Sequence, residues 1–157
     1  MKTQIISIAL GLVALTLASP NAGSAPQSKA DNPQERPYQG TLIVSLTEAN
    51  FPCFEFAAAG RLSHLGNSTV TLIHCFVSPG CVEGSATIIA ANVDELYTTY
   101  EQCIVGGYGS FSYVEGTYTI TGGTGRFEGA SGTGTQKSVF NNVTGSGVAT
   151  VVGTIVY

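Results

Sequence analysis

Short stretches rich in β-branched and apolar residues recur along the chain from Thr41 to its end, and turn residues separate them. Several of these stretches alternate in period two, as in residues 69–77, where every second residue from Val70 to Phe76 falls on one face. No stretch after residue 37 has the spacing of an amphipathic helix. The pattern predicts strands over residues 41–46, 54–63, 69–77, 85–90, 93–103, 111–121, 132–140 and 145–157.

Strands joined by short turns favour an antiparallel all-β domain, either a closed barrel or a sandwich. Closure into a barrel removes the unpaired strand edges. That matters for this chain, because a Val/Thr-rich sequence with few charges has little to protect an open edge. We therefore predict an eight-stranded antiparallel β-barrel.

The first residues predict a secretory signal peptide. Lys2 supplies a positive start, and the apolar run Ile5–Ala18 is shorter than the roughly 20 residues of a membrane-spanning helix. Small residues follow from Ala22 to Ala25, which places cleavage after Ser24 or after Ala25. We expect a signal peptide over residues 1–25, and an uncleaved anchor is the alternative.

A polar, proline-containing stretch follows and predicts a flexible linker over residues 26–37, with the barrel domain over residues 38–157. The sequence contains no second apolar segment of spanning length. We therefore expect a secreted or periplasmic protein that has no membrane partner after processing.

The charge of the chain excludes some function classes. Charged residues make up 10% of the sequence and the formal net charge is -4, whereas soluble domains carry about 25% charged residues. A nucleic-acid-binding protein needs a basic surface for phosphate contacts. We therefore expect no nucleic-acid partner.

Four cysteines, Cys53, Cys75, Cys81 and Cys103, lie in the predicted domain. An even number in an exported chain predicts two disulfides, and four cysteines allow three pairings. Turns near residues 67 and 92 would place Cys53 opposite residue 81 and Cys81 opposite residue 103, so all four thiols gather at one rim and each pairing is feasible. We favour Cys53–Cys75 with Cys81–Cys103. The spacing lacks a C-x-x-C motif, so we expect no metal site and no cofactor.

Polar residues on strands are the candidates for a lumen pocket. Glu55 and Arg61 share one face of a strand whose other residues on that face are small, so a charged pair in the lumen is conceivable, with a solvent-facing side as the alternative. His74 shares a face with apolar residues and is either an acid–base group or a hydrogen-bonded core histidine.

A second set of candidates lies on the stretches 93–103 and 111–121. Tyr97 and Glu101 fall on one side of the first stretch together with Glu95. Two carboxylates at that spacing could do acid–base chemistry if buried together, and a solvated polar face is the alternative. Tyr118 in the second stretch is a further candidate for ligand binding.

The most distinctive segment is Gly-Gly-Thr-Gly-Arg-Phe-Glu-Gly-Ala-Ser-Gly over residues 122–132. It resembles the late hairpin of the allene oxide cyclase family and the matching segment of plant dirigent proteins. The patterns Gly60-x-x-x-His64-Leu-Gly66 and Ala91-Asn-x-Asp94 are similar to those of many exported bacterial proteins of unassigned activity. The resemblance implies the allene oxide cyclase/dirigent-like barrel, in which residues facing the lumen handle a small substrate. The stretch 41–46 lacks the carboxylate or amide that such cyclases carry on their first strand.

Three functions follow from this sequence. The first is an exported, disulfide-stapled barrel that binds a small apolar molecule or serves as a scaffold, since no catalytic constellation is recognisable. The alternative is a dirigent- or cyclase-type enzyme that guides ring closure or coupling of an apolar substrate in its lumen, in which case an isomerase-like activity is expected. A third is a structural module that associates with copies of itself, in which case a homo-oligomer is expected.

Overall fold

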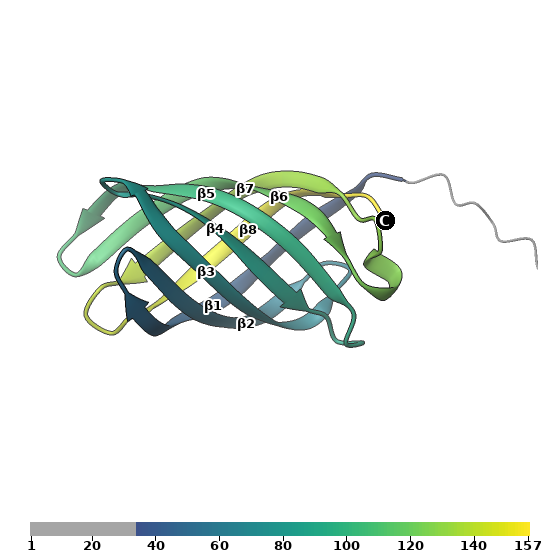
Figure 1. The fold of residues 1–157 in the computed structure, drawn as a ribbon, viewed down its shortest axis with the longest axis horizontal. Coiled ribbons are helices and arrows are strands. Elements are labelled where there is room, and N and C mark those ends of the chain that lie inside the picture. Colours follow the sequence, from purple (N-terminus) through teal and green to yellow (C-terminus); the bar gives the residue numbers. More distant parts are fainter. Residues whose placement is uncertain (1–33) are drawn as a thin grey trace, which may run out of the picture. The chain divides into compact units, whose positions relative to one another are not determined.

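The computed structural model describes residues 34–157, so the predicted signal peptide and most of the predicted linker lie outside the described residues. Figure 1 shows a single barrel of antiparallel strands. The chain order is β1 (Arg36–Asn50), β2 (Cys53–Leu62), β3 (Gly66–Ser78), β4 (Cys81–Ile89), β5 (Glu95–Tyr108), β6 (Phe111–Gly123), the 3₁₀ helix η1 (Gly125–Phe127), β7 (Gly132–Asn141) and β8 (Ser146–Ile155).

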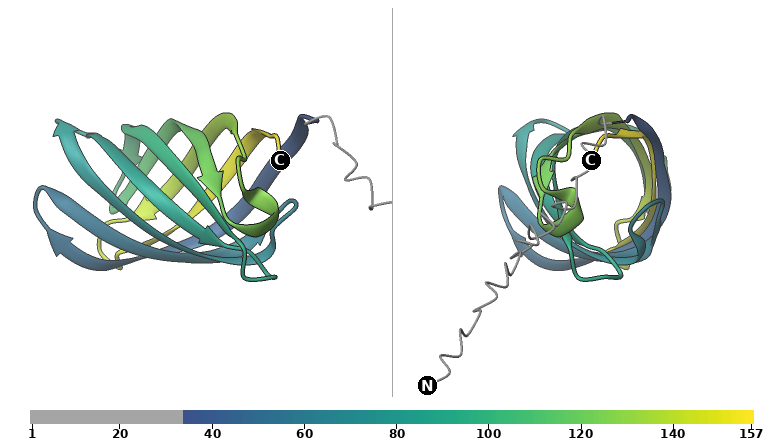
Figure 2. Two further views of the ribbon diagram at one scale, coloured as in Figure 1. Left: turned by 45° about the vertical axis from the view of Figure 1, so that its right-hand side comes forward. Right: turned by 90° about the vertical axis from the view of Figure 1, so that its right-hand side faces the viewer.

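The predicted eight-stranded closed antiparallel barrel is confirmed. Each strand pairs with its neighbour in sequence, and β8 pairs with β1 to close the sheet, as the strands curving around in Figure 2 show. β1 begins at Arg36, two residues before the predicted start of the domain. No helix among residues 34–157 is long and apolar enough to cross a bilayer.

Alternation along each strand separates a lumen face from an outer face. On β2, the buried residues Phe56, Ala58 and Leu62 face inward, while Glu55 and Arg61 are exposed. The most deeply buried large side chains gather at one end of the barrel: Leu62, Leu65, Leu96, Phe127 and Ile155. This end is therefore closed by packing.

Phe127 closes that end. It is fully buried, and its ring packs on Tyr157 with 5.1 Å between the ring centres. The backbone just before and at the start of η1 lies against the turn that precedes β5, and two positions there have no room for a side chain. A Cβ on Gly123 would collide with the Glu95 carbonyl, and one on Gly125 with the Asp94 carboxylate. Gly125 also adopts a φ of 55°, which favours glycine. The glycine-rich segment thus places an aromatic plug.

Asp94 and Arg126 together join three turns at the closed end. Its Oδ2 accepts hydrogen bonds from Asn92 Nδ2 (2.6 Å) and from the Arg126 backbone N–H (3.2 Å), and lies 3.8 Å from Arg126 Nε. Arg126 Nη2 in turn donates to the His64 carbonyl at 2.6 Å. The three motifs that carry the family resemblance therefore meet here, in a structural closure.

The disulfides lie at the opposite, open end. Cys53–Cys75 and Cys81–Cys103 are bonded, each joining directly paired residues of adjacent strands, so the favoured pairing is confirmed. The prediction that Cys53 lies opposite residue 81 is wrong. The β2–β3 hairpin turns around His64, with Leu62 opposite Gly66, because His64 takes a left-handed φ of 67°. The predicted gathering of all four cysteines at one rim is confirmed.

Replacing Asp94 tests the closure. We expect Asp94→Ala to lower the free energy of unfolding by about 2 kcal/mol, because donors on Asn92 and Arg126 lose a charged acceptor. Urea unfolding at neutral pH measures this. The control Glu128→Ala removes an exposed carboxylate of the same segment and should change stability by less than about 0.5 kcal/mol. Equal effects of the two substitutions would contradict the role of Asp94.

Candidate functional site

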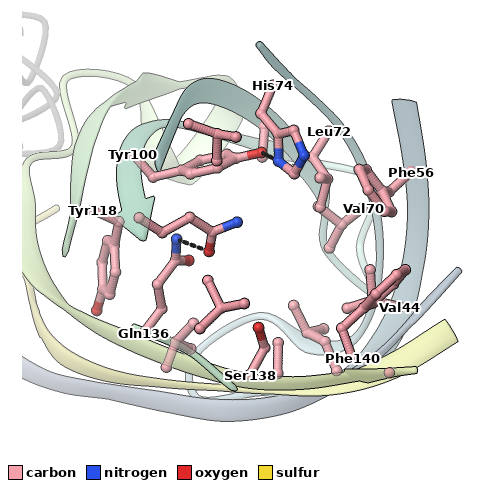
Figure 3. Close-up of a pocket in the computed structure, with 18 of the residues that line it drawn as sticks. Val44, Phe56, Val70, Leu72, His74, Tyr100, Tyr118, Gln136, Ser138 and Phe140 are labelled. Atoms are coloured by element: carbon pink, nitrogen blue, oxygen red, sulfur yellow. Dashed lines mark hydrogen bonds between the residues drawn. The ribbon is translucent and has the colours of Figure 1, made fainter. Parts of the chain in front are cut away.

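A cavity of about 370 Å³ occupies the lumen between the Phe127 plug and the disulfide rim. Figure 3 shows that apolar side chains form one wall and polar side chains another. The apolar wall comes from β1, β2, β3 and β7 and includes Val44, Phe56, Val70, Leu72 and Phe140. Within residues 34–157, no Asp, Glu, Lys or Arg lines this cavity.

Glycines opposite aromatic residues shape the polar wall. Gly84 on β4 lies between His74 on β3 and Tyr100 on β5 in the strand register. A Cβ on Gly84 would approach Tyr100 Cζ to 2.7 Å and His74 Cβ to 2.7 Å. The missing side chain therefore lets the Tyr100 ring lie across β4 toward His74.

Tyr100 and His74 form a neutral polar pair in the lumen. The Tyr100 hydroxyl lies 3.3 Å from His74 Nδ1 and 3.5 Å from the Ile73 carbonyl, and Figure 3 shows the contact with His74. Burial lowers the pKa of His74 and raises the pKa of Tyr100. The imidazole therefore favours its neutral form and the phenol stays protonated, so the pair can donate or accept a hydrogen bond without a net charge.

A pair of amides lies beside these groups. Gln136 Nε2 on β7 donates to Gln102 Oε1 on β5 at 3.0 Å. Figure 3 shows this contact and places Ser138 at the bottom of the view, between Gln136 and Phe140. Both amide side chains retain further donors and acceptors. They can therefore orient a polar group of a bound molecule.

Tyr38 and Tyr118 lie deeper in the lumen, and their hydroxyls differ from the other polar groups there in having no hydrogen-bond partner in the described part of the chain. Their rings meet edge to face with centres 5.9 Å apart. The Tyr118 hydroxyl lies across Gly134 and Gly153, where a Cβ on either glycine would collide with it. Both residues are more than nine-tenths buried, and neither hydroxyl has a hydrogen-bond partner within the described part of the chain.

Burial keeps both phenols protonated. It raises the pKa of Tyr118 to about 12, and burial together with the nearby Tyr118 raises the pKa of Tyr38 further. A buried donor without a partner costs about 1–3 kcal/mol. An acceptor atom of a bound molecule that reached either hydroxyl would remove this cost.

The structure divides the residues proposed from the sequence. His74 and Tyr118 line the cavity. Glu55 and Arg61 lie exposed on the outer face of β2, so they form no charged pair in the lumen.

The face of β5 that carries Tyr97 and Glu101 is also the outer face. There the Tyr97 hydroxyl donates to Glu95 Oε2 at 2.6 Å, and Thr117 Oγ1 donates to Glu101 Oε1 at 3.3 Å. The two carboxylates, Glu95 and Glu101, are not buried together, which removes the geometric basis for paired acid–base chemistry.

Sequence reasoning missed most of the polar residues that line the lumen, among them Tyr38, Tyr100, Gln102 and Gln136. For β5 a signal was present, because Tyr100 and Gln102 share their face with Leu96, which is fully buried. The face of β5 that carries the apolar Leu96, and not the face that carries the carboxylates, predicts the inward position of Tyr100 and Gln102. Tyr38 lies at the predicted boundary between linker and barrel, where the sequence shows no alternation.

His74 makes stability depend on pH. A free histidine binds a proton near pH 6.5, whereas burial lowers the pKa of His74 in the folded protein. Between these two values the unfolded state binds more protons, so this contribution to stability falls as the pH falls from neutral toward the lower pKa. We expect His74→Phe to remove that component, measured as a smaller loss of unfolding free energy between pH 7 and pH 5. An imidazole NMR titration of His74 at or above its ordinary pKa would contradict this.

No family model and no curated protein sequence matches the chain. The chain is similar in structure to a solved pterocarpan synthase dirigent protein, with a TM-score of 0.52 and 13% sequence identity. The match covers 79% of this chain and 87% of that protein. The structural likeness shows the fold alone and leaves activity unassigned. The chain therefore has the dirigent-like fold, an eight-stranded antiparallel barrel.

Proposed function

We propose that this protein is an exported, disulfide-stapled barrel that binds one small, neutral and largely apolar molecule in its lumen. The observation that carries the proposal is the cavity itself, which has an apolar wall and, among residues 34–157, no charged carboxylate, ammonium or guanidinium group in its lining. A bound ion would lack a counter-charge there, and burying an unpaired charge is strongly unfavourable. Two disulfides suit an oxidising compartment.

The size of the cavity supports one ligand. Its volume of about 370 Å³ lies at the lower end of the range of about 300–1,000 Å³ for ligand pockets. Eight-stranded barrels either fill their interior with side chains or hold one small molecule. Here Phe56 and Phe140 pack edge to face across the wall and leave the centre open.

The polar groups define the chemistry of the ligand. The orphaned hydroxyls of Tyr38 and Tyr118 favour a molecule whose deep end carries an acceptor oxygen, such as a ketone or ether. The His74–Tyr100 pair and the Gln102–Gln136 pair favour an additional hydroxyl or carbonyl nearer the open end. The remaining surface of the ligand is apolar.

A second candidate function is catalysis, in which the barrel guides ring closure or coupling of the bound molecule. The His74–Tyr100 contact favours it, because a neutral imidazole beside a phenol can move a proton at a substrate held against the apolar wall. A turnover that stops in His74→Phe, with ligand binding intact, would distinguish this candidate from binding alone.

Filling the lumen tests binding. Prodan, a neutral fluorescent naphthyl ketone, should bind the wild-type protein with a blue-shifted emission, and Ala149→Phe should abolish that binding because residue 149 lines the cavity. The matched control Thr150→Phe adds the same ring to the outer face of β8 and should bind as the wild type does. If the wild type binds neither prodan nor other neutral apolar probes, the barrel is a scaffold and the proposal fails.

The two phenols should select ketones over hydrocarbons. Acetylnaphthalene and isopropenylnaphthalene have nearly the same shape, but only the ketone accepts a hydrogen bond. In competition with prodan, we expect the wild type to prefer the ketone about tenfold, from one hydrogen bond to otherwise unpaired buried donors. The double variant Tyr38→Phe/Tyr118→Phe should lose this preference. Tyr113→Phe, on the outer face of β6, is the control, and an unchanged preference in the double variant would overturn the assignment.

A further inference from the structure

The hairpins at the open end of the barrel each expose one large apolar side chain. We call residues 50–52, 77–80, 108–110 and 142–145 the mouth tips; they join β1–β2, β3–β4, β5–β6 and β7–β8, at the left of Figure 1. Their apolar side chains are Phe51, Val77, Tyr108 and Val143, with exposed fractions of 82%, 56%, 84% and 82%. The mouth tips contain no Asp, Glu, Lys or Arg.

The closed end has a different character. Its turns carry His64, Asp94, Arg126 and Glu128, and Val93, which is also exposed there, lies in the same turn as Asp94. Charged and uncharged turns are thus segregated to opposite ends of one barrel. Apolar side chains exposed together at one end of a protein mark a surface that contacts something less polar than water.

The apolar surface of the mouth tips continues into the cavity. Phe51 stacks on Phe76 with ring centres 6.3 Å apart, and Phe76 packs edge to face on Phe54 at 5.7 Å. Phe54 and Phe76 line the cavity, as do Gly80 and Gly145 of the mouth tips. A molecule that leaves the lumen therefore meets aromatic side chains up to the rim.

We propose that the mouth tips seat on the surface of an electrically neutral lipid bilayer, so that an apolar molecule passes between lipid and lumen without crossing water. The four side chains stand on separate tips around an opening, rather than forming one flat patch. A fluid apolar phase can surround each of them, whereas a second copy of the chain would need a shape that fills the space between the tips. Aromatic side chains such as Phe51 and Tyr108 suit this role, since aromatic rings favour the membrane interface.

The charges indicate the kind of lipid and the depth. The mouth tips offer no basic residue and the chain carries a net charge of -4, so nothing attracts an anionic surface. Glu48 and Glu55, on the outer faces of β1 and β2 below the first tip, limit insertion to the tips. The contact is peripheral. It makes a lipid bilayer a partner of the processed protein, contrary to the expectation from the sequence. Transport of a ligand rests on the proposed function, but the docking itself does not.

Vesicle flotation tests the docking. The exported protein should float with vesicles of phosphatidylcholine alone, and added phosphatidylserine should not increase the bound fraction. The triple variant Phe51→Ser/Tyr108→Ser/Val143→Ser should lower the bound fraction about tenfold or more, because each removed side chain takes apolar area out of the contact. The control Ile43→Ser/Val139→Ser/Val152→Ser removes three exposed apolar residues from the outer wall and should float as the wild type does.

Each other outcome overturns the proposal. A wild type that stays out of the floating fraction, or a control that loses binding as the tip variant does, would show that the mouth tips are not a lipid-docking surface. A concentration-dependent dimer without vesicles, lost only in the tip variant, would identify a second copy as the occupant. All variants have the same N-terminal segment as the wild type, so a difference in the bound fraction is caused by the substituted residues. The lumen variant Ala149→Phe should still float, which separates failure of docking from failure of ligand binding.

Discussion

The open lumen depends on how the other end of the barrel is closed. Phe127 fills that end, and the Asp94 carboxylate fixes the segment that carries it, because it accepts one hydrogen bond from its own turn and one from the Arg126 backbone N–H. Arg126 then ties this segment to a third turn through the His64 carbonyl. Because this closure uses turn residues, the inward positions of the strands farther along need not supply the plug. They are free to line a cavity.

The cavity is shaped by glycines that leave space on one strand for an aromatic side chain from another strand. Gly84 leaves room for Tyr100, and Gly134 with Gly153 leaves room for Tyr118, so each aromatic ring lies along the wall instead of across the centre. These tyrosines also bring their hydroxyl groups into an otherwise apolar interior. The Tyr118 hydroxyl, like that of Tyr38, has no partner in the described part of the chain. The packing that keeps the lumen open thus leaves buried hydrogen-bond donors unpaired beside it.

The strands and the closed barrel could be predicted from the sequence because β-branched alternation and turn residues are local signals. The register that sets Cys81 opposite Cys103 could also be predicted. The register of the β2–β3 hairpin could not, since the turn around His64 depends on a left-handed residue other than glycine. The candidate site was harder, because inward and outward faces exchange with a shift of one residue. The carboxylates of β5 suggested a site on the face that is the outer one, whereas Tyr100 and Gln102 lie on the inner face.

The glycine-rich segment shows a second limit of sequence reasoning. Its resemblance correctly indicated the fold, because the spacing of its glycines is required for backbone contacts with Asp94 and Glu95. Those contacts join residues about thirty positions apart, which no local pattern reveals. A segment that looks distinctive in the sequence therefore supports the site from the far end and does not line it.

The central claim is that the lumen is an open ligand site with its donor groups at the deep end. A crystal of the exported protein soaked in a bromine-bearing naphthyl ketone would test it through the anomalous scattering of bromine. The account predicts bromine density inside the barrel beside Phe56 and Phe140, with the ketone oxygen within hydrogen-bond distance of the Tyr38 or Tyr118 hydroxyl. A lumen filled by side chains, or bromine found on the outer wall alone, would contradict it.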